Sequence, residues 1–133
     1  MGTMADAVLE AGGHVIGVIP QSLEDREVAH RGVQDLRVVA SMHERKQMMA
    51  DLSDGFLALP GGFGTFEEYC EAVTWVQLRI QDKPCILVNL NGYYDPLIAQ
   101  FDRGVAAGFI NDTNRRIVRV VDTIAELLAL LDA

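Results

Sequence analysis

Lysine, cysteine and proline are scarce in this chain of 133 residues, which contains two lysines, two cysteines and four prolines. Acidic residues outnumber basic ones by 19 to 11, and the net charge of −8 argues against binding to nucleic acid or to an anionic membrane surface. No apolar run is long enough to span a bilayer. Because half of the residues are hydrophobic, we expect a globular protein with a single domain over residues 1–133.

The few cysteines and histidines do not suggest a metal site. Cys70 and Cys85 form no C-x-x-C motif, and isolated cysteines in a chain of this size are typical of reduced, packed side chains in a cytosolic protein. His14, His30 and His43 are scattered along the sequence. We therefore expect no metal, no cofactor and a cytoplasmic location.

Short apolar runs alternate with helical patterns along the whole chain. Strands are predicted at His14–Ile19, Leu36–Val39, Phe56–Leu59, Pro84–Asn89 and Ile117–Val121, helices at Met4–Glu10, Ser41–Asp51, Thr65–Arg79, Asp95–Ala107 and Thr123–Leu131, and an exposed loop at Gln21–Gly32. Strands with few polar positions, alternating with helices, predict an α/β fold whose parallel sheet is covered on both faces. Ligands of such sheets bind at the carboxyl ends of the strands.

The segment Pro60–Glu68, with the sequence PGGFGTFEE, follows the third predicted strand and leads directly into a helical pattern. Its glycines let the backbone approach a ligand, and the N–H groups of a first helical turn bind anions. It has neither the lysine of a P-loop nor the third glycine of the dinucleotide fingerprint, so it indicates a different phosphorylated ligand. The same residues fit a capping box with Thr65 as N-cap and Glu68 reaching back to the backbone, a purely structural alternative.

Two further segments fit the capping-box pattern, Ser41–Glu44 and Thr123–Glu126. The first begins a helix whose first turn carries Arg45 and Lys46. Cations at this end oppose the helix dipole by ~0.3–1 kcal/mol each. They are tolerated there if an anion is bound or if the side chains extend into water, and both interpretations stay open. The second segment has no glycine loop and no basic neighbours.

Together, Ser41–Lys46 and, fifteen residues after Arg45, Pro60–Glu68 resemble the paired signature of the LOG family. These proteins are cytokinin riboside 5′-monophosphate phosphoribohydrolases, long mislabelled lysine decarboxylases. The resemblance extends from Met1 to about Val121, through Thr74-Trp75, Lys83-Pro84, Asn91–Asp95 and Gly108–Ile110. It implies a Rossmann-like α/β fold, usually homodimeric, that hydrolyses the N-glycosidic bond of AMP-type nucleotides.

The resemblance also implies which residues act. Arg45 matches the family's catalytic arginine, and Glu68 matches the last position of the motif PGGxGTxxE. The backbone from Gly62 to Thr65 would hold the 5′-phosphate of a nucleoside monophosphate, whose adenine or N6-substituted adenine is released to give ribose 5-phosphate. The implied substrate-binding residues are Glu27, Lys46, Gly61, Gly62, Phe63, Gly64, Thr65, Phe66, Glu67 and Thr74.

One departure from the family pattern lies at the start of the sequence. Family members have a strand and a glycine-rich turn before a Gly-Leu-Met-Gly segment, whereas this chain opens at Met1–Met4, so we expect the first βα unit to be missing. A second interpretation is a nucleotide or molybdenum-cofactor carrier that binds without turnover. A third, a PLP-dependent lysine decarboxylase, requires a Schiff-base lysine, for which Lys46 and Lys83 are the only candidates.

The predicted helix Thr65–Arg79 and the residue after it carry apolar residues on more than one face, namely Phe66, Tyr69, Ala72, Val73, Trp75, Val76, Leu78 and Ile80. A helix that covers one sheet needs a single apolar stripe, so another element or another chain is expected to cover the excess. A missing βα unit would offer one explanation. The family resemblance favours the other, a homodimer with this helix and the Arg45 helix near its interface.

Overall fold

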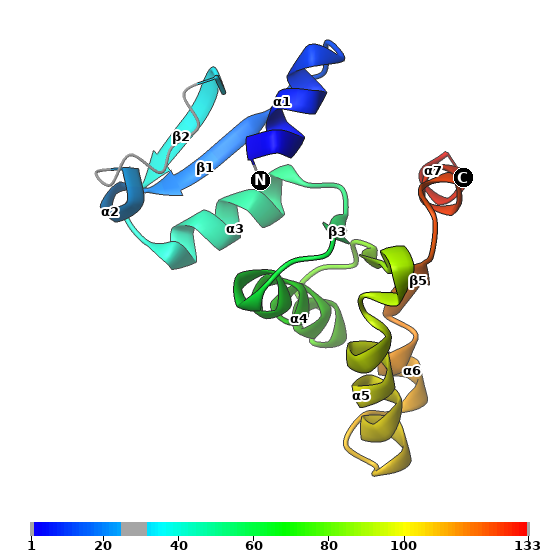
Figure 1. Cartoon of the computed structure of the whole chain (residues 1–133). Helices are drawn as coiled ribbons and strands as arrows, with labels where there is room; N and C mark the ends of the chain where they lie inside the picture. Colours follow the sequence, from blue (N-terminus) through cyan, green and yellow to red (C-terminus); the bar gives the residue numbers. More distant parts are fainter. Residues whose placement is uncertain (1, 25–31, 133) are drawn as a thin grey trace. The chain divides into compact units, whose positions relative to one another are not determined.

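The computed structural model describes residues 2–24 and 32–132. It divides the chain into two compact units, Met1–Ser53 and Asp54–Ala133, which are described one at a time (Figure 1). The single domain expected from the sequence stays a prediction. No helix within the described ranges is long and apolar enough to cross a membrane.

The first unit is built on one pair of parallel strands. Its described elements are α1 (Gly2–Glu10), β1 (Ile16–Pro20), α2 (Gln21–Glu24), β2 (Asp35–Val39) and α3 (Met42–Leu52). The register runs from Ile16 beside Asp35 to Pro20 beside Val39, so α2 and α3 both start at the carboxyl edge of this sheet. The prediction of an exposed loop at Gln21–Gly32 is wrong for its first four residues, which form α2. The following residues, 25–31, lie outside the described part of the chain.

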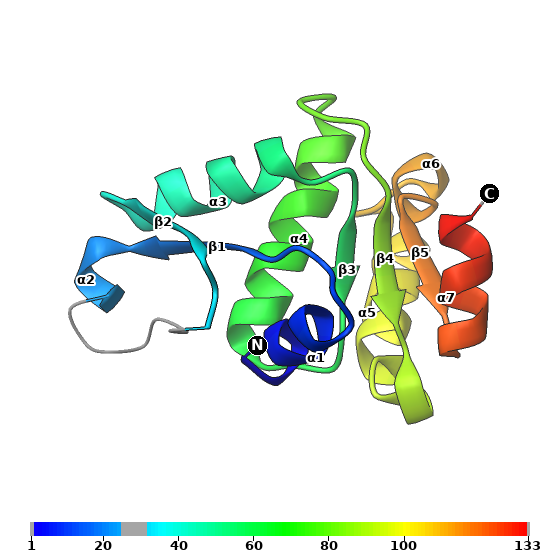
Figure 2. The ribbon, with the colours of Figure 1, turned by 90° about the horizontal axis from the view of Figure 1, so that it is seen from above.

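The second unit contains a parallel sheet in the order β3-β4-β5 (Figure 2). Its elements are β3 (Phe56–Ala58), α4 (Phe63–Gln77), β4 (Cys85–Val88), the 3₁₀ helix η1 (Leu90–Gly92), α5 (Asp95–Ala106), α6 (Asp112–Arg115), β5 (Val118–Val121) and α7 (Ile124–Leu131). Each strand is followed by helices, as the sequence predicted. The short helix α6 was not predicted.

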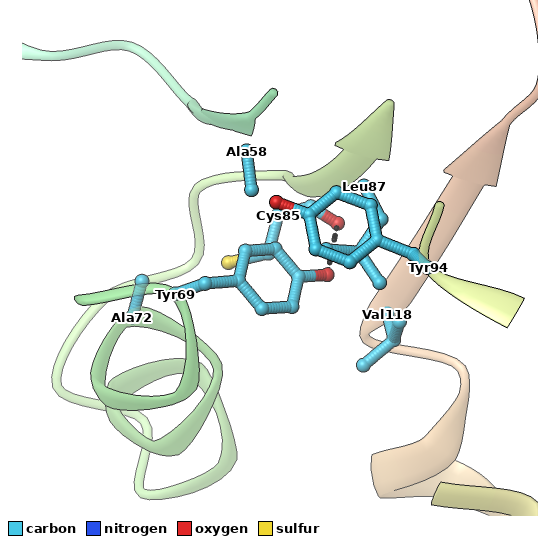
Figure 3. Close-up of a cluster of buried hydrophobic side chains, with 7 residues drawn as sticks. All are labelled: Ala58, Tyr69, Ala72, Cys85, Leu87, Tyr94 and Val118. Carbon is cyan, nitrogen blue, oxygen red and sulfur yellow. Dashed lines mark hydrogen bonds between the residues drawn. The ribbon is translucent and has the colours of Figure 1, made fainter. Parts of the chain in front are cut away.

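Helices cover both faces of this three-stranded sheet. Cys85 and Leu87 of β4 face a cluster with Tyr69 and Ala72 of α4 and with Tyr94, against which α5 also packs (Figure 3). The alternate residues of β4, Ile86 and Val88, pack with Val121 and with Leu127 of α7 on the other face. The predicted α/β class, with parallel strands and helices on both faces, is confirmed.

Within the described residues, β1 pairs with β2 in the first unit, and β3, β4 and β5 form the sheet of the second. One detail differs from the prediction. The strand at Phe56–Leu59 was expected to be buried on both faces, but β3 pairs with one strand and leaves Leu57 48% exposed. Among the strands in the described residues, only β4, with a partner on each side, is buried along its whole length.

Both cysteines are free, but only one of them is packed as predicted. Cys85 is fully buried on β4, and burial raises the pKa of its thiol to about 11. Cys70 lies on the outer side of α4 and is exposed, so the prediction of a packed side chain is wrong there.

Candidate functional site

The glycine loop joins β3 to α4 at the carboxyl edge of the sheet, but the helix starts earlier than the sequence suggested. Gly62 is the N-cap of α4, with φ −97° and ψ −155°, and Phe63 is its first residue. Thr65 is therefore the third helical residue, and the predicted capping box of Thr65 and Glu68 is wrong. The reason is that Phe63 and Gly64 already adopt helical conformation, so the chain turns into the helix before it reaches Thr65.

The other two capping boxes are confirmed and have the same geometry. At α3, the Glu44 N–H donates to the Ser41 hydroxyl (3.1 Å), and the Glu44 carboxylate accepts from the Ala40 N–H (2.8 Å). At α7, the corresponding pair is Thr123 and Glu126, at 3.2 and 2.8 Å. In each of these two helices the N-cap side chain accepts one first-turn N–H, and the glutamate side chain accepts the N–H of the residue before the N-cap.

The N-terminus of α4 has no such side-chain cap. The first N–H that bonds inside the helix belongs to Phe66, which donates to the Gly62 carbonyl (3.1 Å), so the N–H groups of the three residues before it have no acceptor within the helix. The first turn also carries no acidic residue. The N–H groups at the positive end of a fifteen-residue helix, without a side-chain cap, favour an anion such as phosphate.

The polar side chains of α4 lie on two adjacent faces of the helix. Glu67 and Thr74 are seven residues apart, which places both on one exposed face, and the Thr74 hydroxyl donates to the Cys70 carbonyl (2.7 Å). Glu68 is half-buried and turned by roughly 100° from Glu67. Phe66 is also half-buried, with its ring edge-to-face against Tyr94.

The residues after β4 make contacts with the glycine loop that sequence reasoning missed. The Tyr93 hydroxyl donates to the Gly61 carbonyl and the Tyr94 hydroxyl to the Leu59 carbonyl, both at 2.6 Å. A signal was present, because adjacent tyrosines follow Asn91-Gly92 just beyond a predicted strand whose carboxyl end meets the same edge of the sheet. Without the register of β3 and β4, nothing indicated which backbone groups they bind.

Arg45 and Lys46 lie in the first unit, in the second turn of α3. Arg45 is half-buried with a buried Nε, and it lines, with Met49, an otherwise apolar cavity of about 690 Å³ bounded by α1, β1, α2 and β2. The two interpretations given for these cations, a bound anion and extension into water, both stay predictions. Glu27, the remaining predicted site residue, lies outside the described residues.

Comparison with known proteins places these features in a family. The model of a family described as possible lysine decarboxylase matches residues 1–131. A cytokinin riboside 5′-monophosphate phosphoribohydrolase of Rhodococcoides fascians is 46% identical over 132 residues, which cover 98% of this chain and 67% of that protein. The chain belongs to the LOG family.

Plant members of the LOG family are equally similar to it. A probable cytokinin riboside 5′-monophosphate phosphoribohydrolase of Oryza sativa subsp. japonica is 49% identical, and a cytokinin riboside 5′-monophosphate phosphoribohydrolase of Arabidopsis thaliana is 48% identical. Each match covers 99% of this chain, but 59% of the rice protein and 61% of the Arabidopsis protein. The chain thus spans about three fifths of the length of these LOG-family relatives.

Proposed function

We propose that this protein is a nucleotide N-glycosidase that releases adenine or an N6-substituted adenine from a nucleoside 5′-monophosphate and forms ribose 5-phosphate. Membership of the LOG family supports this activity, because relatives are named cytokinin riboside 5′-monophosphate phosphoribohydrolases. The observation that carries the proposal is the start of α4, where the N-cap is a glycine and provides no side-chain cap.

In this proposal the 5′-phosphate binds at the glycine loop. The N–H groups of Gly62, Phe63, Gly64 and Thr65 donate to the phosphate oxygens, and the Thr65 hydroxyl adds one more donor. Space is available for an anion beside the backbone, because a Cβ at Gly62 or at Gly64 would meet no protein atom within 4 Å. Such donors are worth more to a charged phosphate than to a neutral hydroxyl.

The chemical step breaks the bond between C1′ of the ribose and N9 of the base. The electrons of this bond leave with N9, which takes up a proton, and a water molecule adds to C1′ after losing a proton. We propose that the Glu68 carboxylate stabilises the positive charge that develops at the ribosyl centre or accepts the proton of the water. Arg45 is the second proposed catalytic residue, on the strength of the family motif that it matches.

The remaining assignments concern contacts and assembly. Glu27, Lys46, Gly61, Phe66, Glu67 and Thr74 are proposed to contact the substrate. The exposed face shared by Glu67 and Thr74 supports contacts to sugar or base, since both side chains are accessible. A homodimer and a cytoplasmic location complete the proposal.

The test is to incubate the protein with AMP and to follow free adenine and ribose 5-phosphate, with adenosine as the matched substrate that lacks the phosphate. We expect base release from AMP and little from adenosine. Binding of AMP without base release would favour a nucleotide carrier, and equal turnover of both substrates would contradict phosphate recognition. A lysine decarboxylase gains no support from Lys83, which precedes β4 at the edge of the sheet opposite the glycine loop.

A further inference from the structure

Two adjacent tyrosines hold the backbone of the glycine loop from outside it. The Tyr93 hydroxyl donates to the Gly61 carbonyl and the Tyr94 hydroxyl to the Leu59 carbonyl, each at 2.6 Å. We propose that Tyr93 and Tyr94 are positioning residues, which fix this loop in the conformation that binds a nucleoside 5′-phosphate. The identity of the ligand rests on the proposed function, whereas the effect on the loop can be measured without it.

The Tyr93 bond determines the direction of one donor. The Gly61 carbonyl and the Gly62 N–H belong to one planar trans peptide group, so they point in opposite directions. Fixing the carbonyl on Tyr93 therefore directs the Gly62 N–H away from the tyrosine. Glycines on both sides allow this peptide group to flip easily, and a flip would replace the donor by a carbonyl oxygen, which repels an anion.

The Tyr94 bond acts on the peptide group before it. Pro60 has no N–H, so the group that joins Leu59 to Pro60 offers only a carbonyl oxygen, which Tyr94 satisfies. Tyr94 is 1% exposed, and burial raises the pKa of its hydroxyl. The hydroxyl thus keeps its proton, and remains a donor, throughout the neutral pH range.

The tyrosines are themselves held by a polar network at the carboxyl ends of β4 and β5. The amide oxygen of Asn89 accepts from the Tyr94 N–H (2.7 Å), while its Nδ2 donates to Asp95 (2.9 Å) and to Asp122 (3.0 Å). Asn89 is 5% exposed. The rings of Tyr93 and Tyr94 pack edge-to-face, with centroids 5.1 Å apart. The buried Asn89 amide is thus bonded at both its oxygen and its nitrogen, which restrains the backbone at Tyr94 as a positioning role requires.

The experiment compares Tyr93→Phe and Tyr94→Phe with Tyr69→Phe. Each change removes one hydroxyl that donates to a backbone carbonyl, but the acceptor of Tyr69 is Cys85 in β4 (3.3 Å), outside the glycine loop (Figure 3). Tyr93 is 46% exposed, so Tyr93→Phe is expected to fold and to carry the test even if the buried Tyr94→Phe does not.

The first measurement is nitrogen-15 relaxation of the Gly61 and Gly62 amides in the protein without ligand. In Tyr93→Phe we expect their order parameters to fall from roughly 0.85, the value of rigid backbone, toward 0.6. In Tyr69→Phe they should remain as in the wild type. Unchanged order parameters in Tyr93→Phe and in any folded Tyr94→Phe would overturn the proposal.

The second measurement is the affinity for ribose 5-phosphate, together with the kinetics of AMP hydrolysis. Loss of one positioning hydrogen bond is expected to raise the Kd and the KM by about 2- to 10-fold. The kcat should stay within about twofold, because phosphate contacts are made in both the ground state and the transition state. Wild-type affinity in a loosened loop would also overturn the proposal. If the wild type neither binds ribose 5-phosphate nor hydrolyses AMP, the proposed function fails, and the relaxation data alone decide on the tyrosines.

Discussion

Gly61 lies directly against the side chain of Thr65, so that a Cβ built at position 61 would stand 2.9 Å from the Thr65 Cβ and closer still to its hydroxyl oxygen. The backbone at Gly61 therefore lies so close to the Thr65 side chain that only glycine fits at position 61. We predict that Gly61→Ala destabilises the protein by about 1–3 kcal/mol, the usual cost of overpacking. Thermal or urea unfolding measures this, and wild-type stability would contradict the close packing of loop and helix.

The same substitution at Gly64, three residues further on, should not destabilise the protein but should weaken substrate binding. A Cβ there meets no protein atom within 4 Å, and the residue is already helical, so Gly64→Ala should leave the stability unchanged or raise it by up to ~1 kcal/mol. The added methyl group would instead occupy space proposed for the phosphate. Loss of one charged hydrogen bond corresponds to roughly a 10- to 100-fold rise in the KM for AMP. A stable variant with the KM of the wild type would contradict phosphate binding at this turn.

The proposed catalytic residues give a third prediction. Arg45→Ala and Glu68→Gln should each lower kcat/KM for AMP by ~10²–10³, as expected when a charge that acts in the transition state is removed. Because Arg45 is half-buried beside an apolar cavity, its removal also takes away packing, and melting curves are needed to separate this effect from catalysis. Full turnover by either folded variant would refute the assignment.

The capping box of α7 provides the control for Glu68→Gln. Glu126→Gln makes the same chemical change in a residue whose carboxylate accepts from the Asp122 N–H at the start of a helix. It should leave AMP hydrolysis unaffected and cost at most ~0.5–2 kcal/mol of stability. A large loss of activity in Glu126→Gln would mean that such a change lowers activity by disturbing the fold. A loss of activity in Glu68→Gln would then no longer support a catalytic role for Glu68.

The fourth prediction concerns assembly. The most exposed apolar residues near α4 are Phe63 at its start and Leu78 and Ile80 just beyond its end, at 91%, 60% and 64%. If a second copy covers this surface, light scattering should give about twice the monomer mass of 14.6 kDa, and Ile80→Glu should shift the protein toward the monomer. Phe109→Glu, at an equally exposed phenylalanine after α5, is the control and should not change the mass. A monomeric wild type would rule out the dimer.

Local sequence signals predicted much of the fold. Apolar strands and the capping boxes at Ser41 and Thr123 gave element positions within about two residues, because these signals act on neighbouring residues. The capping box predicted at Thr65 is wrong, although its sequence matches the pattern as well as those at Ser41 and Thr123 do. A glycine N-cap has no side chain that would mark the helix start in the sequence. The sequence therefore did not distinguish a helix that begins after Gly62 from one that begins at Thr65.

The parts that sequence could not predict depend on pairing between distant segments. The contacts of Tyr93 and Tyr94 with the loop follow from β3 lying beside β4, and the exposure of Leu57 follows from β3 having one partner in its sheet. The glycine loop itself could be recognised, since its glycines and its position after a strand are local features. The tyrosines that bind the loop lie about thirty residues further along the chain, so a local sequence pattern does not reveal their contacts with it.

The order of the strands also bears on how the second unit forms during synthesis. Cys85 pairs in parallel with Phe56 on one side and with Val118 on the other, so its second partner is synthesised only about thirty residues after β4 itself. Until then the most buried strand, Cys-Ile-Leu-Val, has an unpaired edge and an apolar face that α7 has not yet covered. Uncharged, β-prone segments of this kind are the usual starting points of aggregation. A nascent chain that stalls before Val118 therefore leaves this strand open to other chains.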